Sequence, residues 1–466
     1  MIDEGLVFFQ KVFLIMELEF LQYKEAEMKK LTLPLVILLI LVCVSAVVAQ
    51  EKVRLTVEMS VYVEAPHKKA FDLLKEAYEL QNPNVEIVYY GPAYDEYWDK
   101  LAVEIVSGTE ADIVQLQDAA ARYATYASLR EGETGAFINL DQYIKGTELE
   151  DKLIGQKELV FNGHYIGIAN YATGMRGVYY RKSLFEEAGI DADTIITNED
   201  FLEVAKTLTK NKADGTMQYG FGAVISTHAF AYDEMKTFIC YPIGATYTQL
   251  NKPPFEPDNI IVGNEAWNYA FKWWQDMIFT HKVVAPTPYD KAGERDLFWN
   301  GVVAMNIDGP WFVGMTKEYD EALLDDLDII ASPDVVYNGK QYPFHKQNYG
   351  ITHLVSSNSK NPDEAIKFLL WMATPEAQAL VSECGMIPSN TEYSTGSDYY
   401  ATWPLNAKLA SLAEERYYEP PTLDPEIPEL GEINRIMINA AQAAFVNQED
   451  VADVLDEAAE EIKSLF

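Results

Sequence analysis

The chain has 466 residues, of which 48% are hydrophobic and 23% are charged, a composition typical of a globular protein with a large core. At this length we expect about two globular lobes rather than one. The net charge of −36 and the lack of any Lys- and Arg-rich stretch exclude nucleic acid as a partner, because a phosphate backbone must be met by clustered cations.

The first segment of the chain has the pattern of an export signal. Two lysines follow Met28, an uncharged apolar run extends from Leu31 to Val48, and small residues end it at Ala49. This pattern predicts a signal peptide within residues 1–49, a true start at Met28 and a mature chain beginning near Gln50. An uncleaved membrane anchor is the alternative, since the run is long enough to span a bilayer. Both interpretations predict an exported protein, periplasmic or associated with the cell surface.

The elements after the leader alternate between strand and helix. Apolar residues alternate from Val53 to Met59, a helix opens at Pro66, and Val85–Tyr90 forms a second strand. Helical spacing from Tyr94 to Ile105 then leads to a strand at Ile113–Leu116. This order predicts a parallel α/β sheet.

Ligands of parallel α/β sheets bind beyond the carboxyl ends of the strands. The loops that follow the three predicted strands are Glu64–His67, Gly91–Tyr94 and Gln117-Asp118. We therefore expect these loops to form one half of a binding site. Each of their polar residues could instead be a solvated loop residue.

The same pattern recurs later in the chain and predicts a second α/β lobe. A capping box begins at Thr197, helices begin at Asn264 and Asn361, and an amphipathic helix extends from Val451 to Leu465. Three tryptophans occupy apolar helical stripes and are expected in the core: Trp98, Trp267 and Trp274.

The cysteines and the motifs give no sign of a metal, a cofactor or a catalytic centre. Cys43 lies in the leader, which leaves Cys240 and Cys384, and the sequence does not decide whether these two pair. The chain contains neither Gly-x-Ser-x-Gly nor His-Glu-x-x-His. We expect no cofactor and no enzyme activity. A secreted carbohydrate-active enzyme remains the alternative, because two facing carboxylates would suffice for one.

Four segments occur in the order and spacing of a known family: Gly108–Ile113, Gly163–Ile168 with Tyr179–Ile190, Phe298–Trp311, and Asn358–Ser389. The most specific are the run that begins Tyr179-Tyr180-Arg181-Lys182 and the Gly309-Pro310-Trp311 signature. Through these segments the chain resembles the family 1 extracellular solute-binding proteins of ABC importers, the group that contains maltose-type binding proteins.

The resemblance implies an α/β, two-lobed periplasmic-binding-protein-like fold (type II), in which each lobe is a sheet flanked by helices and hinge crossovers join the lobes. The expected limits are 50–166 and 341–386 for lobe 1, and 167–340 and 387–466 for lobe 2. It further implies that a monomer captures a small polar ligand, a sugar or oligosaccharide, by hinge closure, and delivers it to the permease subunits of an ABC transporter. A ligand-sensing subunit of a membrane receptor is the alternative partner role.

Sugar sites combine flat aromatic side chains with carboxylates and amides. The resemblance points to Trp311, Tyr349 and Arg176, although core packing could account for the two aromatics and a salt bridge for the arginine. The loops at the strand ends add four candidates to the site: Glu64, Tyr94, Gln117 and Asp118.

Overall fold

The computed structural model describes residues 52–466, apart from 118, 175, 344–348, 397, 416–423 and 426. The predicted leader therefore lies outside the described residues. Within the part of the chain that is described, no helix combines the length and the apolar character needed to cross a bilayer.

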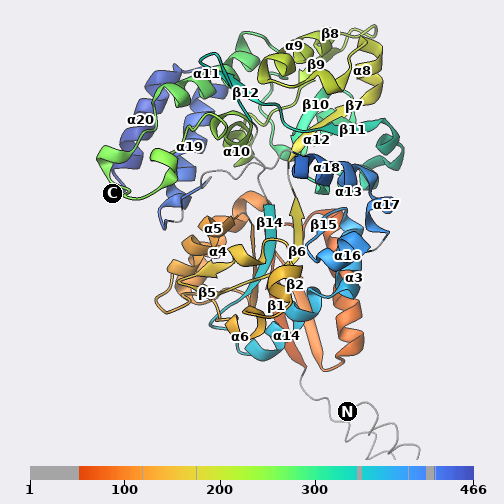
Figure 1. Ribbon diagram of the computed structural model, residues 1–466, viewed down its shortest axis with the longest axis vertical. Helices are drawn as coiled ribbons and strands as arrows, with labels where there is room; N and C mark the ends of the chain where they lie inside the picture. Colours follow the sequence, from red (N-terminus) through yellow and green to blue (C-terminus); the bar gives the residue numbers. More distant parts are fainter. Residues whose placement is uncertain are drawn as a thin grey trace, which may run out of the picture. The chain divides into compact units, whose positions relative to one another are not determined.

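The first sheet has six strands and contains the predicted parallel strands (Figure 1). β1 pairs with β2 and β3 in parallel, while β14 runs antiparallel between β3 and β6. In spatial order its strands are β15 (Ile387–Pro388), β6 (Ile168–Gly174), β14 (Tyr349–Val355), β3 (Ile113–Gln117), β1 (Val53–Glu58) and β2 (Val85–Tyr90).

Helices bury the apolar faces of this sheet. α3 packs on β2, α5 packs on β3, and α14 packs on β6, β14 and β1, which encloses a core around Phe71 and Phe368. The helices near this sheet are α3 (Ala65–Gln81), α4 (Tyr94–Ser107), α5 (Ala119–Ser128), α6 (Asp141–Ile144), α7 (Leu149–Lys152), α14 (Pro362–Met372) and α15 (Pro375–Val381).

The second sheet confirms the expected second α/β unit. Its central strand β10 pairs in parallel with β9 and antiparallel with β7. In spatial order its strands are β11 (Leu327–Ile330), β7 (Gly177–Arg181), β10 (Val303–Asp308), β9 (Met217–Phe221) and β8 (Lys210–Asn211). Two hairpins lie outside both sheets, β4 (Val160–Phe161) with β5 (His164–Tyr165), and β12 (Val335–Tyr337) with β13 (Lys340–Tyr342).

A separate set of helices encloses the core of the second sheet, in which Trp267 and Trp274 are fully buried, as the sequence predicted. These helices are α8 (Lys182–Ala188), α9 (Asn198–Leu208), α10 (Phe230–Met235), α11 (Glu265–Phe279), α12 (Lys291–Trp299), α13 (Trp311–Asp320), α19 (Leu430–Phe445) and α20 (Val451–Lys463). Three further helices follow β15: α16 (Thr391–Gly396), α17 (Tyr399–Thr402) and α18 (Pro404–Glu415).

The helix starts agree with the sequence signals. Thr197 and Asp200 form the predicted capping box at α9, and the side chain of Asn264 accepts hydrogen bonds at the start of α11. Both cysteines of the described chain, Cys240 and Cys384, are free and buried, which decides the question that the sequence left open.

His353 makes the first core sensitive to acid. Its Nδ1 lies 2.8 Å from Oδ1 of Asn170, so Nδ1–H donates and Nε2 is the atom that would take up a further proton. Burial lowers the pKa of His353 to about 3. A histidine in the unfolded chain titrates near about 6.5, so the folded state binds fewer protons below that pH. The stability from neutral His353 is therefore present above pH 6.5 and is lost as the pH falls toward 3.

We expect this residue to lower the free energy of unfolding by about 2 kcal/mol between pH 7 and pH 5. Denaturant titrations of the wild type and of His353→Asn at both pH values measure the effect, because the variant lacks the titrating group. The stability advantage of the wild type should shrink by this amount at pH 5, and an advantage that does not change with pH would contradict the assignment.

Candidate functional site

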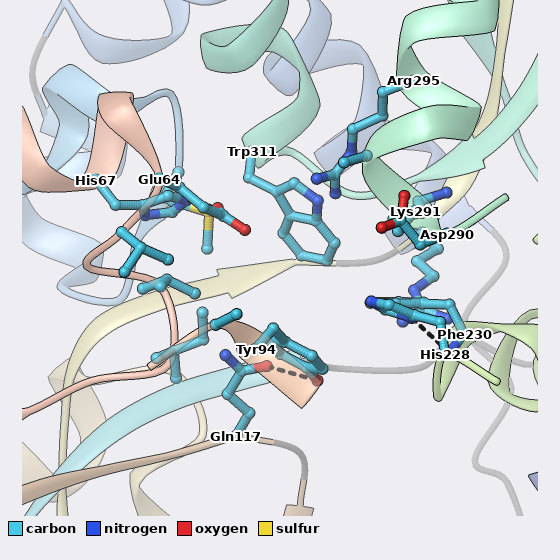
Figure 2. Close-up of a pocket in the computed structure, with 17 residues that line it drawn as sticks. Glu64, His67, Tyr94, Gln117, His228, Phe230, Asp290, Lys291, Arg295 and Trp311 are labelled. Carbon is cyan, nitrogen blue, oxygen red and sulfur yellow. Dashed lines mark hydrogen bonds and ion pairs between the residues drawn. The ribbon is translucent and has the colours of Figure 1, made fainter. Parts of the chain in front are cut away.

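A cavity of about 260 Å³, here called the central cavity, is lined by residues from elements of both sheets (Figure 2). The loops and helix starts that follow β1 and β2 contribute Glu64, His67 and Tyr94, and the end of β3 contributes Gln117. Elements around the second sheet contribute Arg176, His228, Phe230, Asp290, Lys291, Arg295 and Trp311. A solute in this cavity can therefore contact both units of the fold.

Gln117 ends β3 and is held in place by its neighbours. Its Nε2 donates to the hydroxyl of Ser60 over 3.0 Å, and its Oε1 accepts from the hydroxyl of Tyr94 over 3.3 Å. Ser60 donates in turn to Oε1 of Gln115. This chain of hydrogen bonds fixes an amide and a phenol at the wall of the cavity, where they can exchange hydrogen bonds with a ligand.

Glu64 immediately precedes α3, and Pro66 in the first turn helps to start this helix. One turn along, His67 places Nε2 3.2 Å from Oε2 of Glu64. His67 is almost fully buried, and its Nδ1 contacts the hydroxyl of Tyr171. The carboxylate of Glu64 is therefore oriented by a fixed partner while it stays partly exposed to the cavity.

Trp311 is placed by a tightly held turn at the end of β10. The amide of Gly309 donates to Oδ1 of Asp308, and the hydroxyl of Tyr179 donates to the carbonyl of Gly309. A Cβ atom at Gly309 would lie 2.2 Å from the Trp311 ring, so only glycine permits this close approach. Figure 2 shows the indole pointing into the cavity between Glu64 and Asp290.

An aromatic contact joins the two sides of the cavity. The ring of His228 is stacked on Phe230 at 5.2 Å and on Tyr94 at 6.1 Å between centroids. Nδ1 of His228 accepts the backbone N–H of Phe230 over 3.1 Å. Burial, together with the nearby cations, lowers the pKa of His228 to about 4, so the imidazole is neutral at neutral pH.

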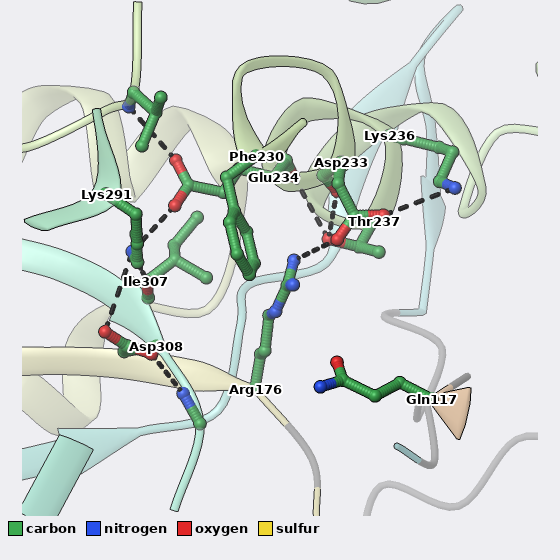
Figure 3. Close-up of polar contacts among 12 residues, drawn as sticks. Gln117, Arg176, Phe230, Asp233, Glu234, Lys236, Thr237, Lys291, Ile307 and Asp308 are labelled. Carbon is green, nitrogen blue, oxygen red and sulfur yellow. Dashed lines mark hydrogen bonds and ion pairs between the residues drawn. The ribbon is translucent and has the colours of Figure 1, made fainter. Parts of the chain in front are cut away.

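Arg176 carries an ion pair at the cavity wall. Its Nη1 lies 2.6 Å from Oδ2 of Asp233, and its guanidinium lies over the ring of Phe230 at 4.4 Å (Figure 3). Lys236 approaches the other oxygen of Asp233 at 3.3 Å. Partial burial raises the pKa of Asp233, but Arg176 and Lys236 favour the carboxylate more strongly and hold this pKa below its usual range. Arg176 is thus both a salt-bridge residue and a cavity residue.

Lys291, the first residue of α12, is the centre of a buried ionic cluster. Its ammonium group donates to Glu234 over 2.7 Å (Figure 3). It also donates to the carbonyl of Ile307 over 2.6 Å and to Glu294. Burial alone would lower the pKa of Lys291. The nearby carboxylates of Asp308, Glu234 and Glu294 have the larger effect, so this pKa is raised. Burial raises the pKa of Glu294 well above its usual value, and Glu234 raises it further.

Arg295 lies one turn further along α12 and forms a bidentate ion pair with Asp308. Its Nε donates to Oδ2 over 2.8 Å, and its Nη2 donates to Oδ1 over 3.2 Å. Burial raises the pKa of Asp308, but the positive charges of Arg295 and Lys291 have the larger effect and lower this pKa to about 2. Each of the three strong cations of the cavity wall is therefore paired with a carboxylate, and the carboxylates of Glu234 and Asp308 are buried.

The structure brings five of the seven candidate residues to one cavity: Glu64, Tyr94, Gln117, Arg176 and Trp311. Asp118 lies outside the described residues. Tyr349 begins β14, and its side chain is likewise outside the described part. Whether these residues bind a ligand stays a prediction.

Of the second-sheet wall only Arg176 and Trp311 were predicted, and the other residues were not: His228, Phe230, Asp290, Lys291 and Arg295. Lys291 and Arg295 are four residues apart on a helix, a spacing that ordinarily indicates a solvated face, so no local signal set them apart. Trp98 was expected in the core, but it is only half-buried and lines another cavity, because its side of α4 faces α5 and α19. Among the described residues no cluster of three or more potential ligands could hold a metal ion.

Comparison with known proteins agrees with this architecture. A binding protein of Brucella abortus is 27% identical over 406 residues, covering 84% of this chain and 88% of its own. The maltotriose-binding protein of Pyrococcus abyssi is 24% identical over 332 residues, which cover 70% of this chain and 64% of that protein.

Among solved structures, the solute-binding protein of an ABC transporter from Agrobacterium radiobacter K84, in complex with ribitol, superimposes with a TM-score of 0.74 at 20% identity. The match covers 89% of this chain and 99% of that one, which confirms the two-lobed binding-protein fold. The model of one family matches residues 74–408, well over half of the sequence. The chain therefore belongs to the family of bacterial extracellular solute-binding proteins.

Proposed function

We propose that this protein captures an uncharged sugar or oligosaccharide outside the cytoplasm and delivers it to the permease subunits of an ABC transporter. The central cavity carries the proposal, since it combines the indole of Trp311 with carboxylates and amides that can bind hydroxyl groups. The relatives add support, because one is named for maltotriose and a similar structure contains ribitol. The family is one of binding proteins, so no chemical step is required.

The charge of the ligand follows from the ion pairs. Lys291 uses all three of its N–H groups on Glu234, Glu294 and Ile307, and Arg295 is paired with Asp308. A ligand carboxylate or phosphate would be desolvated without gaining an uncompensated cation, which costs free energy. Hydroxyl groups can still donate to Glu64 and Asp290. These contacts favour a neutral polyhydroxylated solute.

Hinge closure is the proposed mechanism. We propose that each lobe contains one sheet. Since β6 and β15 belong to the six-stranded sheet, lobe 1 then extends to Gly174, the end of β6, and includes β15 up to Pro388. This moves the first crossing from the expected position to the segment between β6 and β7. A ligand that contacts Gln117 on one lobe and Trp311 on the other would stabilise the closed state over the open one.

Export to the periplasm or the cell surface, behind the leader of residues 1–49, is part of the same proposal, as is a monomeric state. The family supports an extracellular site of action. The leader itself can be tested by N-terminal sequencing of the protein secreted by its host, where a first residue near Gln50 is expected.

The binding assignment is tested with purified residues 50–466 in a thermal-shift and tryptophan-fluorescence screen of neutral sugars and their matched uronic acids. We expect saturable stabilisation by a neutral sugar, and binding of its uronate that is weaker by about tenfold or more. The ligand should be recovered unchanged. Tighter binding of the uronate would refute the charge argument, and steady formation of a product would show an enzyme.

A further inference from the structure

The guanidinium of Arg295 is held on one side and open on the other. Its Nε and Nη2 donate to the two oxygens of Asp308, and these are its only hydrogen bonds to described residues. Its Nη1 has no such bond and is not shut off from solvent, so its N–H groups remain accessible. Arg295 lines the central cavity beside the indole of Trp311 (Figure 2). It can therefore donate hydrogen bonds to a ligand although its charge is neutralised.

Glu64 faces Arg295 from the other side of the cavity (Figure 2). The carboxylate of Glu64 pairs with His67, and no ion pair joins it to Arg295 among the described residues. Burial lowers the pKa of Arg295, but Asp308 and, less strongly, Glu64 raise it, so the charges of Glu64 and Arg295 interact across the cavity. A donor beside the second sheet and an acceptor beside the first are thus separated by space that a ligand can fill.

A hydroxyl group suits the space between these two side chains. Arg295 can only donate hydrogen bonds, and the carboxylate of Glu64 can only accept them. A hydroxyl oxygen accepts from the guanidinium while its own proton is donated to the carboxylate, so both side chains are satisfied. A ligand carboxylate could accept from Arg295, but it would face Glu64 as a second negative charge.

Asp308 decides which charge Arg295 presents to the ligand. It ends β10, is fully buried and is not among the residues that line the central cavity. Besides its two bonds from Arg295, it accepts the backbone N–H of Gly309 over 2.9 Å, and Lys291 lies 3.7 Å away. The carboxylate of Asp308 therefore cancels the charge of the guanidinium and fixes its orientation, while it leaves Nη1 as a donor.

We propose that Arg295 is a specificity-determining residue that donates to a ligand hydroxyl also bound by Glu64, and that Asp308 is the positioning residue that makes the site prefer neutral sugars over anionic ones. This proposal rests on the proposed sugar-binding function and adds the residues that recognise a hydroxyl and set the charge preference. A hydroxyl bonded from both sides of the cavity also links ligand binding to closure of the lobes.

Two substitutions should move the charge preference in opposite directions. Asp308→Asn keeps the shape of the side chain and an oxygen for the N–H of Gly309, but it leaves Arg295 as an uncompensated cation. Arg295→Gln removes the cation, while Asp308 keeps Lys291 and the N–H of Gly309 as partners and the variant should fold. A purely structural role would weaken the binding of neutral and anionic sugars alike in both variants.

Titration calorimetry at pH 7 measures the preference as the ratio of two affinities, that for a neutral sugar and that for its acid. The probes are glucose, galactose and mannose with their uronic acids, and maltose with maltobionic acid. For the pair whose neutral member binds, Asp308→Asn should lower this ratio by about tenfold or more. Arg295→Gln should weaken binding of the neutral sugar by about tenfold or more, because a hydrogen bond from a charged donor is lost, and should raise the ratio.

The ion pair between Arg181 and Asp326 provides matched controls. Nε of Arg181 likewise donates to a carboxylate oxygen of Asp326, over 2.5 Å, and neither residue lines the central cavity. Arg181→Gln and Asp326→Asn should leave the ratio of affinities within about twofold of the wild type. Circular dichroism and thermal melting show which variants are folded, and if Asp308→Asn is not, Arg295→Gln decides alone.

The outcomes separate this proposal from the function on which it rests. If the wild type binds a neutral sugar but folded Arg295→Gln keeps its affinity, or if the ratio moves in the same direction in both folded variants, Arg295 and Asp308 do not have these roles and sugar binding still stands. If the wild type binds no sugar of this panel or of a wider one, both proposals are overturned.

Discussion

Replacing Lys291 with methionine is expected to lower the free energy of unfolding by about 3–5 kcal/mol. The ammonium group of Lys291 is almost fully buried and contacts Glu234, Glu294 and the carbonyl of Ile307. Without it, the carboxylate of Glu234 would stay in the interior with no counterion at this position, and the cost of that desolvation is what the variant measures. Denaturant titration at pH 7 gives the free energy directly.

Two further variants show whether the charge is the cause. Adding Glu234→Gln to Lys291→Met should recover part of the loss, because the uncompensated charge is removed. Lys272→Met is the matched control: Lys272 is also paired with a carboxylate, that of Asp276, but it is 56% exposed, so its loss should cost no more than about 1 kcal/mol. Equal losses for the two lysine variants would contradict the buried cluster.

Replacing Trp311 with alanine is expected to weaken sugar binding by about 2 kcal/mol, on the order of thirtyfold. The indole is held over Gly309 and points into the central cavity, where it offers the largest flat apolar surface (Figure 2). Its removal takes away the surface on which the C–H face of a sugar ring would pack. Titration calorimetry with the sugar identified in the screen measures the loss.

Trp311 also packs against the first core and against a separate cluster around Phe298 and Phe312, so a loss of stability must be separated from a loss of binding. Trp273→Ala is the matched control, because Trp273 is also half-buried but stacks on Phe238, within the second core. It should lower the melting temperature and leave the affinity unchanged. Trp311→Phe should keep most of the affinity, and full affinity in folded Trp311→Ala would remove this residue from the site.

Much of the fold could be predicted from local patterns in the sequence. The strand from Val53, the helix after Pro66 and the capping box at Thr197 all occur where apolar periodicity and capping residues predicted them. The lobe limits were less predictable. β6 was expected in lobe 2, yet it pairs with β14, and strand pairing depends on partners far along the chain that periodicity does not specify.

The sequence by itself determined the first wall of the site. Glu64, Tyr94 and Gln117 come together because carboxyl ends of parallel strands meet at one edge of a sheet, and the order of strands and helices is enough to predict that meeting. Trp311 was indicated by the resemblance of the Gly309-Pro310-Trp311 signature to the solute-binding family, and it follows the end of β10.

Only the tertiary structure decided the remaining residues of the second wall. Lys291 contacts Glu234, which lies 57 residues away in the chain. Trp98 lines a cavity separate from the central one, because α19, far along the chain, faces α4 and α5. Helical spacing shows which residues share a face but not what that face meets. Whether a charged residue is solvated or neutralised inside the protein, and whether a tryptophan is core or cavity wall, therefore depends on how distant helices pack.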